Sequence, residues 1–398
     1  MAFKASPGVG AGGGMERDAV QVGQGVPSGG RAGPGAKPPG AQCPGTEGAG
    51  PEAEGGGGSG VGSAGERPCL GIYVGADVLG DALIKLPLIR GLRAAFPGHR
   101  LLWIAGRGPS VFRGVLAPLV ADALDEVRIY DGIGTSWGEL LRPRLREPFF
   151  DLFVDTQRAL RTTLALKRWP HRVFISGTGN YLFSDRAPPV GAVLPGAVYE
   201  RVRQLLSLAA GCEVVGDVGP LPLPAALLAE AGRLLPPGPA YVGLVPGAGQ
   251  PEKCWPLPRY IELAQDLLAG GRVPVFFLGP GEREWVAPLR EAVPGALLPE
   301  WQAAGPHPGG VLLGMALARR LVASVANDAG GGHLLATGGR PMVSLYGDHD
   351  PAKFVSPWTR TVALTGRQFG GPEVARIPLA AVRAALEPLI EGSPPPTP

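Results

Sequence analysis

The chain has no long hydrophobic run and little charge, and each absence excludes a class of protein. Nowhere in its 398 residues do about 18 consecutive apolar residues occur, the length that a membrane-spanning helix needs. Its first residues also lack an apolar core of signal-peptide length, so we expect a cytoplasmic protein. Charged residues make up 18% of the chain and the formal net charge is +3. Without a long Lys/Arg block, no nucleic-acid partner is expected.

Cysteine is scarce as well. The four cysteines, Cys43, Cys69, Cys212 and Cys254, are scattered along the chain. Their spacing is not that of a metal site, and their density is not that of a disulfide scaffold. We therefore expect reduced thiols and no metal ligation by cysteine.

Glycine and proline are abundant instead, and they are unevenly spread. The chain has 64 Gly and 45 Pro, and residues 1–66 alone hold 22 Gly and 7 Pro with almost no aromatic residue. Such a segment cannot bury enough apolar surface to offset the entropy lost on ordering. The sequence therefore predicts a disordered tail followed by 332 residues, enough for two domains.

From Cys69 onward, short apolar runs alternate with amphipathic segments. This alternation is typical of a parallel sheet covered by helices on both faces, and it restarts near residue 241 after a Pro/Gly/Ala-rich stretch. We therefore expect two doubly wound α/β domains with the ligand at the carboxyl ends of their strands. The expected division is a tail at 1–66, an N-terminal domain at 67–215, a linker at 216–239, a C-terminal domain at 240–372, a helix at 373–391 and a disordered end at 392–398.

The loop after the first predicted strand carries the first candidate for chemistry. It ends in Gly80 and Asp81, where an amphipathic helix begins. Asp81 would lie at the rim of the cleft between the domains. An acid in the first helical turn is also a common structural feature favoured by the helix dipole, and that interpretation stays open. Asp77, in the same loop, competes for any role.

Two loops of the second half suit an anionic ligand. Lys253 lies between a strand ending at Gly247 and a helix, where it can neutralise phosphate, although most single lysines are merely solvated. Residues 327–333 read Asn-Asp-Ala-Gly-Gly-Gly-His after another strand. Glycines let the backbone approach a ligand and the first N–H groups of a helix face an anion, although a plain tight turn explains them too. His333 alone is more often structural than catalytic.

Taken in order, these loops resemble glycosyltransferase family 9, the bacterial ADP-heptose:lipopolysaccharide heptosyltransferases, over about residues 69–366. Any one motif is weak, but four motifs occur in the family's order. The matching residues are Gly80, Asp81, Pro87, Leu88, Ile89, Phe96, Pro97 and Gly98 in the first motif, Lys253, Trp255, Pro256 and Tyr260 in the second, Leu278, Gly279, Pro280, Gly281 and Glu282 in the third, and Asn327, Asp328, Gly330, His333, Pro341, Gly347, Asp350 and Pro351 in the fourth.

The resemblance implies the GT-B fold, two Rossmann-like domains facing a central cleft, and a metal-independent transfer that inverts the sugar's configuration. It implies that Asp81 is the general base and that Lys253 and the helix start at 330–332 stabilise the diphosphate. Glu282 resembles the acid that holds the ribose, and Asp328 the acid near the sugar and diphosphate. The implied nucleotide-sugar site comprises Gly247, Lys253, Glu282, Asp328, Ala329, Gly330, Gly331, Gly332 and His333.

The resemblance also implies the partners. ADP-heptose would be the co-substrate, without metal or other cofactor, and a lipid-linked glycan such as the lipopolysaccharide core would be the acceptor. The C-terminal helix would pack back on the N-terminal domain. Contact with the cytoplasmic face of the inner membrane would use a basic and apolar face; a solvated basic helix with its apolar side in the core explains the same residues. These residues are Trp137, Leu140, Leu141, Arg142, Arg144, Leu145, Arg146, Phe149, Phe150, Arg158, Arg161, Lys167 and Arg168.

Two departures from the family pattern leave alternatives open. Ala329 stands where the family has a hydroxyl residue. In the loop with Asp348, His349 and Asp350, a candidate donor or acceptor contact near the cleft, Asp348 and His349 replace the family's usual Pro-Thr. A different nucleotide-sugar donor, or a non-catalytic or regulatory paralogue that only binds the nucleotide sugar, would explain these changes. A sugar-nucleotide epimerase is a smaller possibility. The first loop lacks the Gly-x-Gly-x-x-Gly spacing of a nicotinamide-dependent oxidoreductase.

Overall fold

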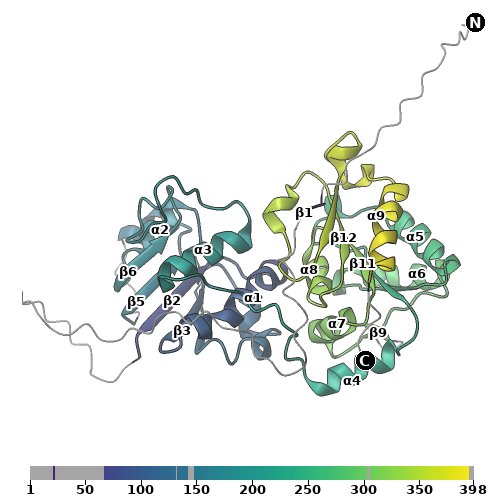
Figure 1. The fold of residues 1–398 in the computed structure, drawn as a ribbon, viewed down its shortest axis with the longest axis horizontal. Coiled ribbons are helices and arrows are strands. Elements are labelled where there is room, and N and C mark those ends of the chain that lie inside the picture. The colour runs from purple at the N-terminus through teal and green to yellow at the C-terminus, as the bar shows by residue number, and fades with distance from the viewer. Residues whose placement is uncertain (1–20, 23–66, 131, 142–147, 303–304, 394–398) are drawn as a thin grey trace, which may run out of the picture.

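A computed structural model describes residues 21–22, 67–130, 132–141, 148–302 and 305–393. They form two α/β domains, each built on its own mainly parallel sheet, as the sequence predicted (Figure 1). Most of the expected tail at 1–66 and the end at 394–398 lie outside the described residues. Within the tail, β1 (Gln21–Val22) pairs antiparallel with the edge of the C-terminal sheet.

The N-terminal sheet has the order β4-β3-β2-β5-β6, with all of these neighbours parallel. The central strand is buried over its whole length, because both faces of the sheet are covered. Alternate residues therefore enter two different cores, with Ile72 in one and Tyr73 in the other. The strands are β2 (Cys69–Val74), β3 (Arg100–Ala105), β4 (Glu126–Ile129), β5 (Phe150–Asp155) and β6 (His171–Ser176).

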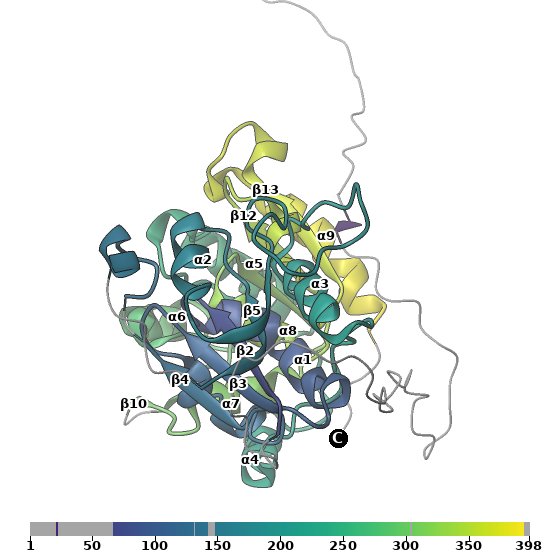
Figure 2. The same cartoon turned by 90° about the vertical axis from the view of Figure 1, so that its left-hand side faces the viewer.

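Helices α1 (Leu79–Ala95) and α3 (Val198–Ala210) contact each other and cover one face of this sheet (Figure 2). Ten residues of α1 are buried, so this helix is central to the domain rather than a surface helix. On the other face, the short α2 (Leu160–Leu166) contributes Leu166 to a core of aromatic side chains in which Phe153 stacks on Trp169. The order of elements places the start of α1 at the carboxyl edge of the sheet.

The C-terminal sheet has the order β1-β13-β12-β11-β7-β8, and its neighbours are parallel apart from the β1–β13 pair. Its strands from β7 on are β7 (Tyr241–Val245), β8 (Val273–Phe276), β11 (Ala323–Asn327), β12 (Met342–Tyr346) and β13 (Thr361–Thr365). A separate antiparallel pair joins β9 (Trp301–Gln302) to β10 (Gly305–Pro306). The helices are α4 (Ala225–Leu234), α5 (Leu257–Ala269), α6 (Val286–Ala292), α7 (Gly310–Ala318), α8 (Gly330–Ala336) and α9 (Leu379–Glu391).

The C-terminal helix α9 packs on its own domain, against β11, β12 and α5. Val382, Leu386 and Leu389 form an apolar stripe at helical spacing and are buried in that core. The expectation that this helix packs on the N-terminal domain is therefore wrong. Its stripe is satisfied by the adjacent face of the C-terminal sheet.

The two domains touch through α1 and α8. Leu83 and Leu86 of α1 belong to the same buried cluster as Leu334 and Leu335 of α8, so one core runs across the domain boundary. The indole N–H of Trp358, near the end of the C-terminal sheet, donates to the carbonyl of Leu83 at 2.8 Å. These contacts fix α1 against the C-terminal domain.

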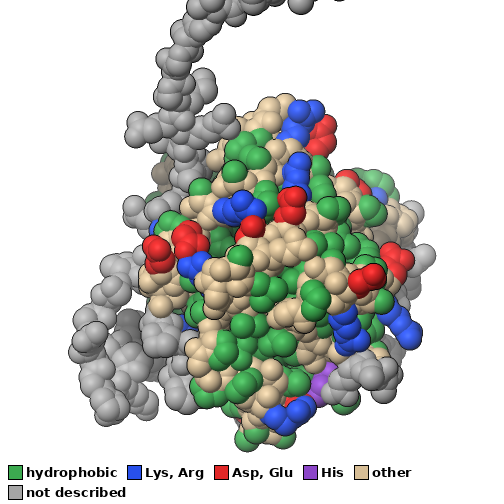
Figure 3. Space-filling model, turned by 90° about the vertical axis from the view of Figure 1, so that its right-hand side faces the viewer, with side chains coloured by type: hydrophobic (Ala, Val, Ile, Leu, Met, Phe, Trp, Pro, Cys, Tyr) green, Lys and Arg blue, Asp and Glu red, His purple; other side chains and the backbone are tan. Residues whose placement is uncertain are grey.

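The outer face of the C-terminal domain carries charges of both signs (Figure 3). Positive and negative side chains are interspersed with hydrophobic ones on the outer face of the C-terminal domain (Figure 3). Within the described ranges, no helix is long and apolar enough to cross a membrane, and no cluster of three His, Cys, Asp or Glu side chains suits a metal ion.

The described cysteines differ in state. Cys69 and Cys254 are free thiols, as expected. Cys212 is disulfide-bonded, so the expectation of a reduced thiol is wrong there. It follows α3 at the surface and is only half-buried, whereas Cys69 lies inside β2.

Candidate functional site

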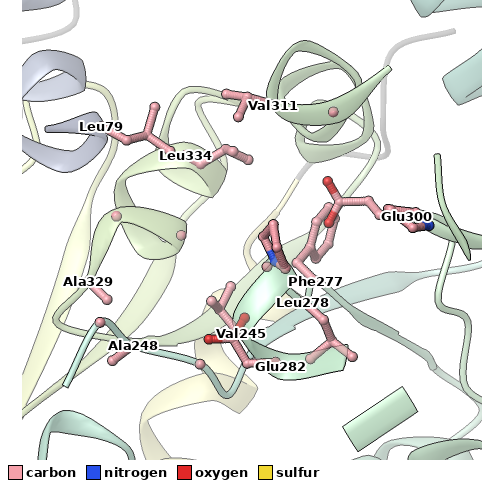
Figure 4. Close-up of a pocket in the computed structure, with 18 of the residues that line it drawn as sticks. Leu79, Val245, Ala248, Phe277, Leu278, Glu282, Glu300, Val311, Ala329 and Leu334 are labelled. Atoms are coloured by element: carbon pink, nitrogen blue, oxygen red, sulfur yellow. The ribbon is translucent and has the colours of Figure 1, made fainter. Parts of the chain in front are cut away.

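The ends of β7 and β8 and the starts of α7 and α8 enclose a cavity of about 340 Å³ (Figure 4). Of the residues predicted from the sequence, Gly247, Glu282, Ala329, Gly330 and Gly331 line it. Leu79, at the start of α1, reaches the same wall from the N-terminal domain. The lining is mainly aliphatic and aromatic, so the cavity suits an organic ligand with a few polar groups.

Glu282 enters the cavity from the loop after β8. Its carboxylate lies directly against the Cα atoms of two glycines: a Cβ on Gly247 would collide with its Oε1, and a Cβ on Gly279 would lie 2.7 Å from its Oε2. The absence of both side chains leaves room for the carboxylate in this position. Figure 4 shows it pointing across the end of β7 toward Val245.

The side chain of Asn327, at the end of β11, fixes the loop that carries Lys253. Its Oδ1 accepts the backbone N–H of Trp255 at 3.0 Å and the hydroxyl of Tyr260 at 3.2 Å, and its Nδ2 donates to the carbonyl of Pro246 at 2.8 Å. All three contacts are buried. Hydrogen bonds require defined distances and angles, so this amide fixes the position of the backbone on both sides of the loop.

Lys253 and Asp328 form the charged centre next to the cavity. Lys253 Nζ lies 3.5 Å from Asp328 Oδ2, and His349 Nδ1 lies 3.1 Å from the same oxygen. The Asp328 side chain is 7% exposed, whereas that of Lys253 is 27% exposed and that of His349 47% exposed. A buried carboxylate thus lies next to two accessible nitrogen groups, each able to meet an anion.

The three glycines at the start of α8 have three different neighbours. A Cβ on Gly330 would lie 3.5 Å from the backbone nitrogen of Gly80, and one on Gly331 would lie 2.6 Å from Val245 Cγ1. A Cβ on Gly332 would lie 3.0 Å from the carbonyl oxygen of Asn327. Gly330 and Gly331 border the cavity, while Gly332 is buried against β11. The glycine run therefore serves close packing as well as access to the cavity.

Asp81 and Asp77, the competing acids of the first loop, have separate environments. Asp77 is 1% exposed, and its carboxylate accepts hydrogen bonds from Lys85 at 2.8 Å, Trp103 at 2.6 Å and Ser110 at 2.8 Å. It is therefore a structural group that holds α1 to β3. Asp81 is only half-buried, in the first turn of α1. That leaves Asp81 as the acid of this loop with access to a ligand.

His333 stands between the two domains. Burial lowers its pKa, while the charges of Asp328 and Asp81 act in the opposite direction. The acid from each domain is thus close enough to act on the same ring. Its Cδ2 would lie 3.1 Å from a Cβ on Gly80, so glycine at that position permits the close approach of α1 and α8.

Comparison with known proteins gives the family. The sequence profile of glycosyltransferase family 9 (heptosyltransferase) matches residues 140–376, more than half of the chain. The chain belongs to glycosyltransferase family 9. It is 29% identical over 315 residues to lipopolysaccharide heptosyltransferase 1 of Pseudomonas aeruginosa, covering 75% of this chain and 84% of that protein.

Solved structures show the same fold. A family 9 glycosyltransferase from Veillonella parvula matches with a TM-score of 0.60 at 17% identity, covering 82% of this chain and 98% of the other. The E. coli heptosyltransferase WaaC with ADP matches with a TM-score of 0.56 at 20% identity, covering 82% and 99%. As a member of family 9 with this fold, the protein is a glycosyltransferase.

The loop after β12 contributes one of its three predicted residues to this glycosyltransferase's charged centre. His349 pairs with Asp328, as described above. Asp348 instead pairs with Arg367 at 2.9 Å on the exposed surface, and Asp350 accepts the N–H of Ala352 at 3.0 Å as the cap of a short helix. His349 thus lies at the charged centre, whereas the two acids have local partners, and a role of this loop toward donor or acceptor stays a prediction.

Sequence reasoning missed three residues near the site. Glu300 and His307, on either side of the β9–β10 pair, line the cavity. Burial and the charge of Arg158 lower the pKa of Arg201 on α3, and the nearby charge of Asp81 acts in the opposite direction. None belongs to a motif, so only the fold brings them together.

The predicted acceptor face is only partly described. Residues 142–147 lie outside the described residues. Arg161 donates to the carbonyl of Gly134 at 2.7 Å and Lys167 to that of Phe183 at 2.9 Å, so these two cations hold loops. Of the predicted apolar side chains, Trp137 and Phe149 are exposed, whereas Phe150 is fully buried in β5, so its place on this face is wrong.

Proposed function

We propose that this glycosyltransferase moves a heptose from ADP-heptose to a lipopolysaccharide core or related cell-envelope glycan, with inversion and without a metal ion. The observation that carries the proposal is the juxtaposition across the domain boundary. The first turn of α1, with Asp81, packs on the first turn of α8, and the latter directly follows the Asp328–Lys253 pair. Asp81, the proposed base, and Lys253, the proposed phosphate-binding group, would therefore lie on the two sides of the reacting sugar.

The transfer needs a base on the acceptor side. In the proposed step the Asp81 carboxylate takes the proton of the acceptor hydroxyl as its oxygen attacks the anomeric carbon. The bond from that carbon to the diphosphate breaks, and the nucleotide leaves with the electron pair. Attack opposite the leaving group inverts the configuration. The half-buried position of Asp81 at the domain boundary supports this role.

The departing diphosphate gains negative charge that must be stabilised. Lys253 Nζ and the first N–H groups of α8 would provide this, and His349 adds a third nitrogen group on the same side. Asp328 lies within ion-pair distance of both Lys253 and His349, so its proposed role is to orient them rather than to contact the phosphate. Glu282 would accept the ribose hydroxyls in the cavity that we assign to the nucleoside.

The acceptor would approach from the N-terminal domain. Trp137 is 55% exposed and Phe149 is 56% exposed, and large apolar side chains exposed in one region suit a lipid-anchored substrate. We propose a cytoplasmic protein that makes peripheral contact with the inner membrane there. The curated relative from Pseudomonas aeruginosa is named for lipopolysaccharide, which supports that acceptor class.

The test is nucleotide binding followed by transfer. The full chain would be titrated with ADP, UDP, GDP and CMP, with Lys253→Ala as the variant and the exposed Lys353→Ala as the matched control. We expect ADP to bind best, Lys253→Ala to weaken it by roughly 10- to 100-fold, the range for a lost charge-assisted contact, and the control to change little. Preference for another nucleotide would contradict the donor assignment, and no binding would favour a non-catalytic paralogue.

A further inference from the structure

Glu300, a half-buried residue, presents its carboxyl to the cavity, and nothing proposed above uses it. It lies directly before β9 and lines the cavity on the side of α7, away from Glu282 (Figure 4). Among the described residues, no group donates a hydrogen bond to its carboxyl or pairs with it, and burial is the cause that raises its pKa to about 8. At neutral pH such a group is mainly a neutral acid, with one hydroxyl donor and one carbonyl acceptor.

The backbone around Glu300 is held on both sides. The carbonyl of Glu300 accepts the N–H of His307 at 2.7 Å, across the β9–β10 pair. The indole of Trp301 donates to the carbonyl of Leu278 at 3.0 Å, which ties β9 to the end of β8. Glu300 is therefore carried by a fixed segment of the cavity wall.

A glycine of α7 leaves room for the carboxyl of Glu300. A Cβ on Gly314, in the middle of α7, would lie 2.8 Å from Glu300 Oε1. Glycine inside a helix costs about 1 kcal/mol relative to alanine, so its presence here needs a reason. Two side chains approach the helix backbone closely there: the carboxyl of Glu300, and Leu334, whose Cδ2 would lie 3.1 Å from the same Cβ.

The other titratable side chains on the described cavity wall are His307 and Glu282, and Glu282 is the group proposed above for the ribose. His307 Nδ1 accepts the N–H of Gly309 at 3.0 Å, and its Nε2 lies 3.1 Å from Glu230. The carboxylate of Glu282 lies over Gly247 and Gly279. Glu300 is thus the group that gives the apolar end of the cavity a donor and an acceptor side by side.

We propose that Glu300 binds the amine edge of adenine, accepting from N6 and donating to the neighbouring ring nitrogen. That edge carries a donor beside an acceptor, and proteins read it with the amide of Asn or Gln, which has the same shape as a neutral carboxylic acid. The inference rests on the proposed nucleotide site. It makes Glu300 a specificity residue for the donor nucleotide.

The test compares two nucleotides on the wild type and on two Glu300 variants. Calorimetry would compare ADP with purine riboside 5′-diphosphate, which lacks the exocyclic amine, on the wild type, Glu300→Gln and Glu300→Leu. We expect the wild type to prefer ADP by roughly tenfold, about one hydrogen bond. Glu300→Gln would keep that preference within about threefold, and Glu300→Leu would bind both ligands alike. Glu284→Gln, at an exposed acid, is the matched control.

The outcomes separate this inference from the proposed function. ADP binding in which Glu300→Leu keeps the wild-type preference would overturn the role of Glu300 and leave the nucleotide site standing. A wild type that binds neither ligand would overturn both. Thermal melting of Glu300→Leu shows whether it folds, and the isosteric Glu300→Gln keeps the test decisive if it does not.

The pH dependence of binding gives a second readout. Above about pH 8 the wild-type acid ionises, loses its donor and binds ADP less tightly, whereas Glu300→Gln has no such loss. The same pH dependence in both proteins would contradict the proposed hydrogen bond.

Discussion

Asn327 Oδ1 accepts the backbone N–H of Trp255 at 3.0 Å, joining two family motifs that are 72 residues apart in the sequence. The motif with Lys253 and the motif with Asp328 are therefore parts of one hydrogen-bonded unit. Trp255 contributes by packing: its side chain is fully buried and its indole donates to the carbonyl of Ile377 at 2.8 Å. The tryptophan and the asparagine position the lysine and need not touch the substrate.

Asn327→Ala should destabilise the protein and weaken donor binding together. It leaves the N–H of Trp255 and the carbonyl of Pro246 buried without their partner, which costs about 2–4 kcal/mol for two such groups. Urea unfolding measures the free energy, and ADP titration measures the site. Gln265→Ala, which removes one exposed hydrogen bond, is the control and should cost little. An Asn327→Ala protein with wild-type stability would contradict the assigned network.

Substitution of Asp81 should reduce activity, whereas substitution of Asp77 should reduce stability. Asp81→Asn removes the proposed base, so the turnover number should fall by about 10²–10⁴, with ADP affinity and stability nearly unchanged. Asp77→Asn leaves Lys85 without its buried partner and should cost about 3–5 kcal/mol of folding free energy. Transfer kinetics and urea unfolding on both variants make the comparison. An active Asp81→Asn enzyme would overturn the base assignment.

The sequence could predict the fold and the cleft edge because both follow from local patterns. Apolar runs alternating with amphipathic segments predict strands and helices, and parallel strands bring the loops with Asp81, Lys253 and Asp328 to one side. The glycines at 330–332 were predicted as a ligand turn, yet Gly332 is needed for packing against Asn327. A pattern shows that a side chain is small but not what lies next to it.

The remaining features depend on contacts between distant segments, which no local pattern carries. Glu300 belongs to no motif, and its place in the cavity depends on the ties of Trp301 and His307 to other elements. Helix α9 has an apolar stripe that would fit either domain, and the structure places it on the C-terminal sheet. The family pattern suggests that Asp348 lies near the cleft, but that pattern does not reveal its partner Arg367, which is 19 residues away.

Glu300 should make stability depend on pH. Its pKa is raised from 4.5 to about 8 in the folded protein, so between those values the folded state holds a proton that the unfolded chain has lost. The free energy of unfolding therefore falls as pH rises through this window, by at most about 1.4 kcal/mol per pH unit. Glu300→Gln should remove this slope. Urea unfolding at pH 5 and pH 8 compares the two proteins, and equal slopes would contradict the burial of this acid.

Ala329→Ser should give α8 the side-chain cap that the family's hydroxyl residue can provide. Ala329 occupies the N-cap of α8 with extended backbone angles, φ −154° and ψ 170°, and it offers no side-chain cap. Serine there should raise the free energy of unfolding by about 0.5–2 kcal/mol, because its oxygen accepts a free N–H of the first turn.

Nucleotide binding to Ala329→Ser also tests whether the start of α8 binds the diphosphate. Ala329 lines the cavity and follows Asp328, so a serine hydroxyl could also donate to a diphosphate and tighten ADP binding by about 2- to 10-fold. Adenosine, which lacks the diphosphate, should gain nothing. An equal gain for adenosine would mean that the hydroxyl acts only by stabilising α8. No gain for ADP would place the diphosphate elsewhere and remove the role proposed for the start of this helix.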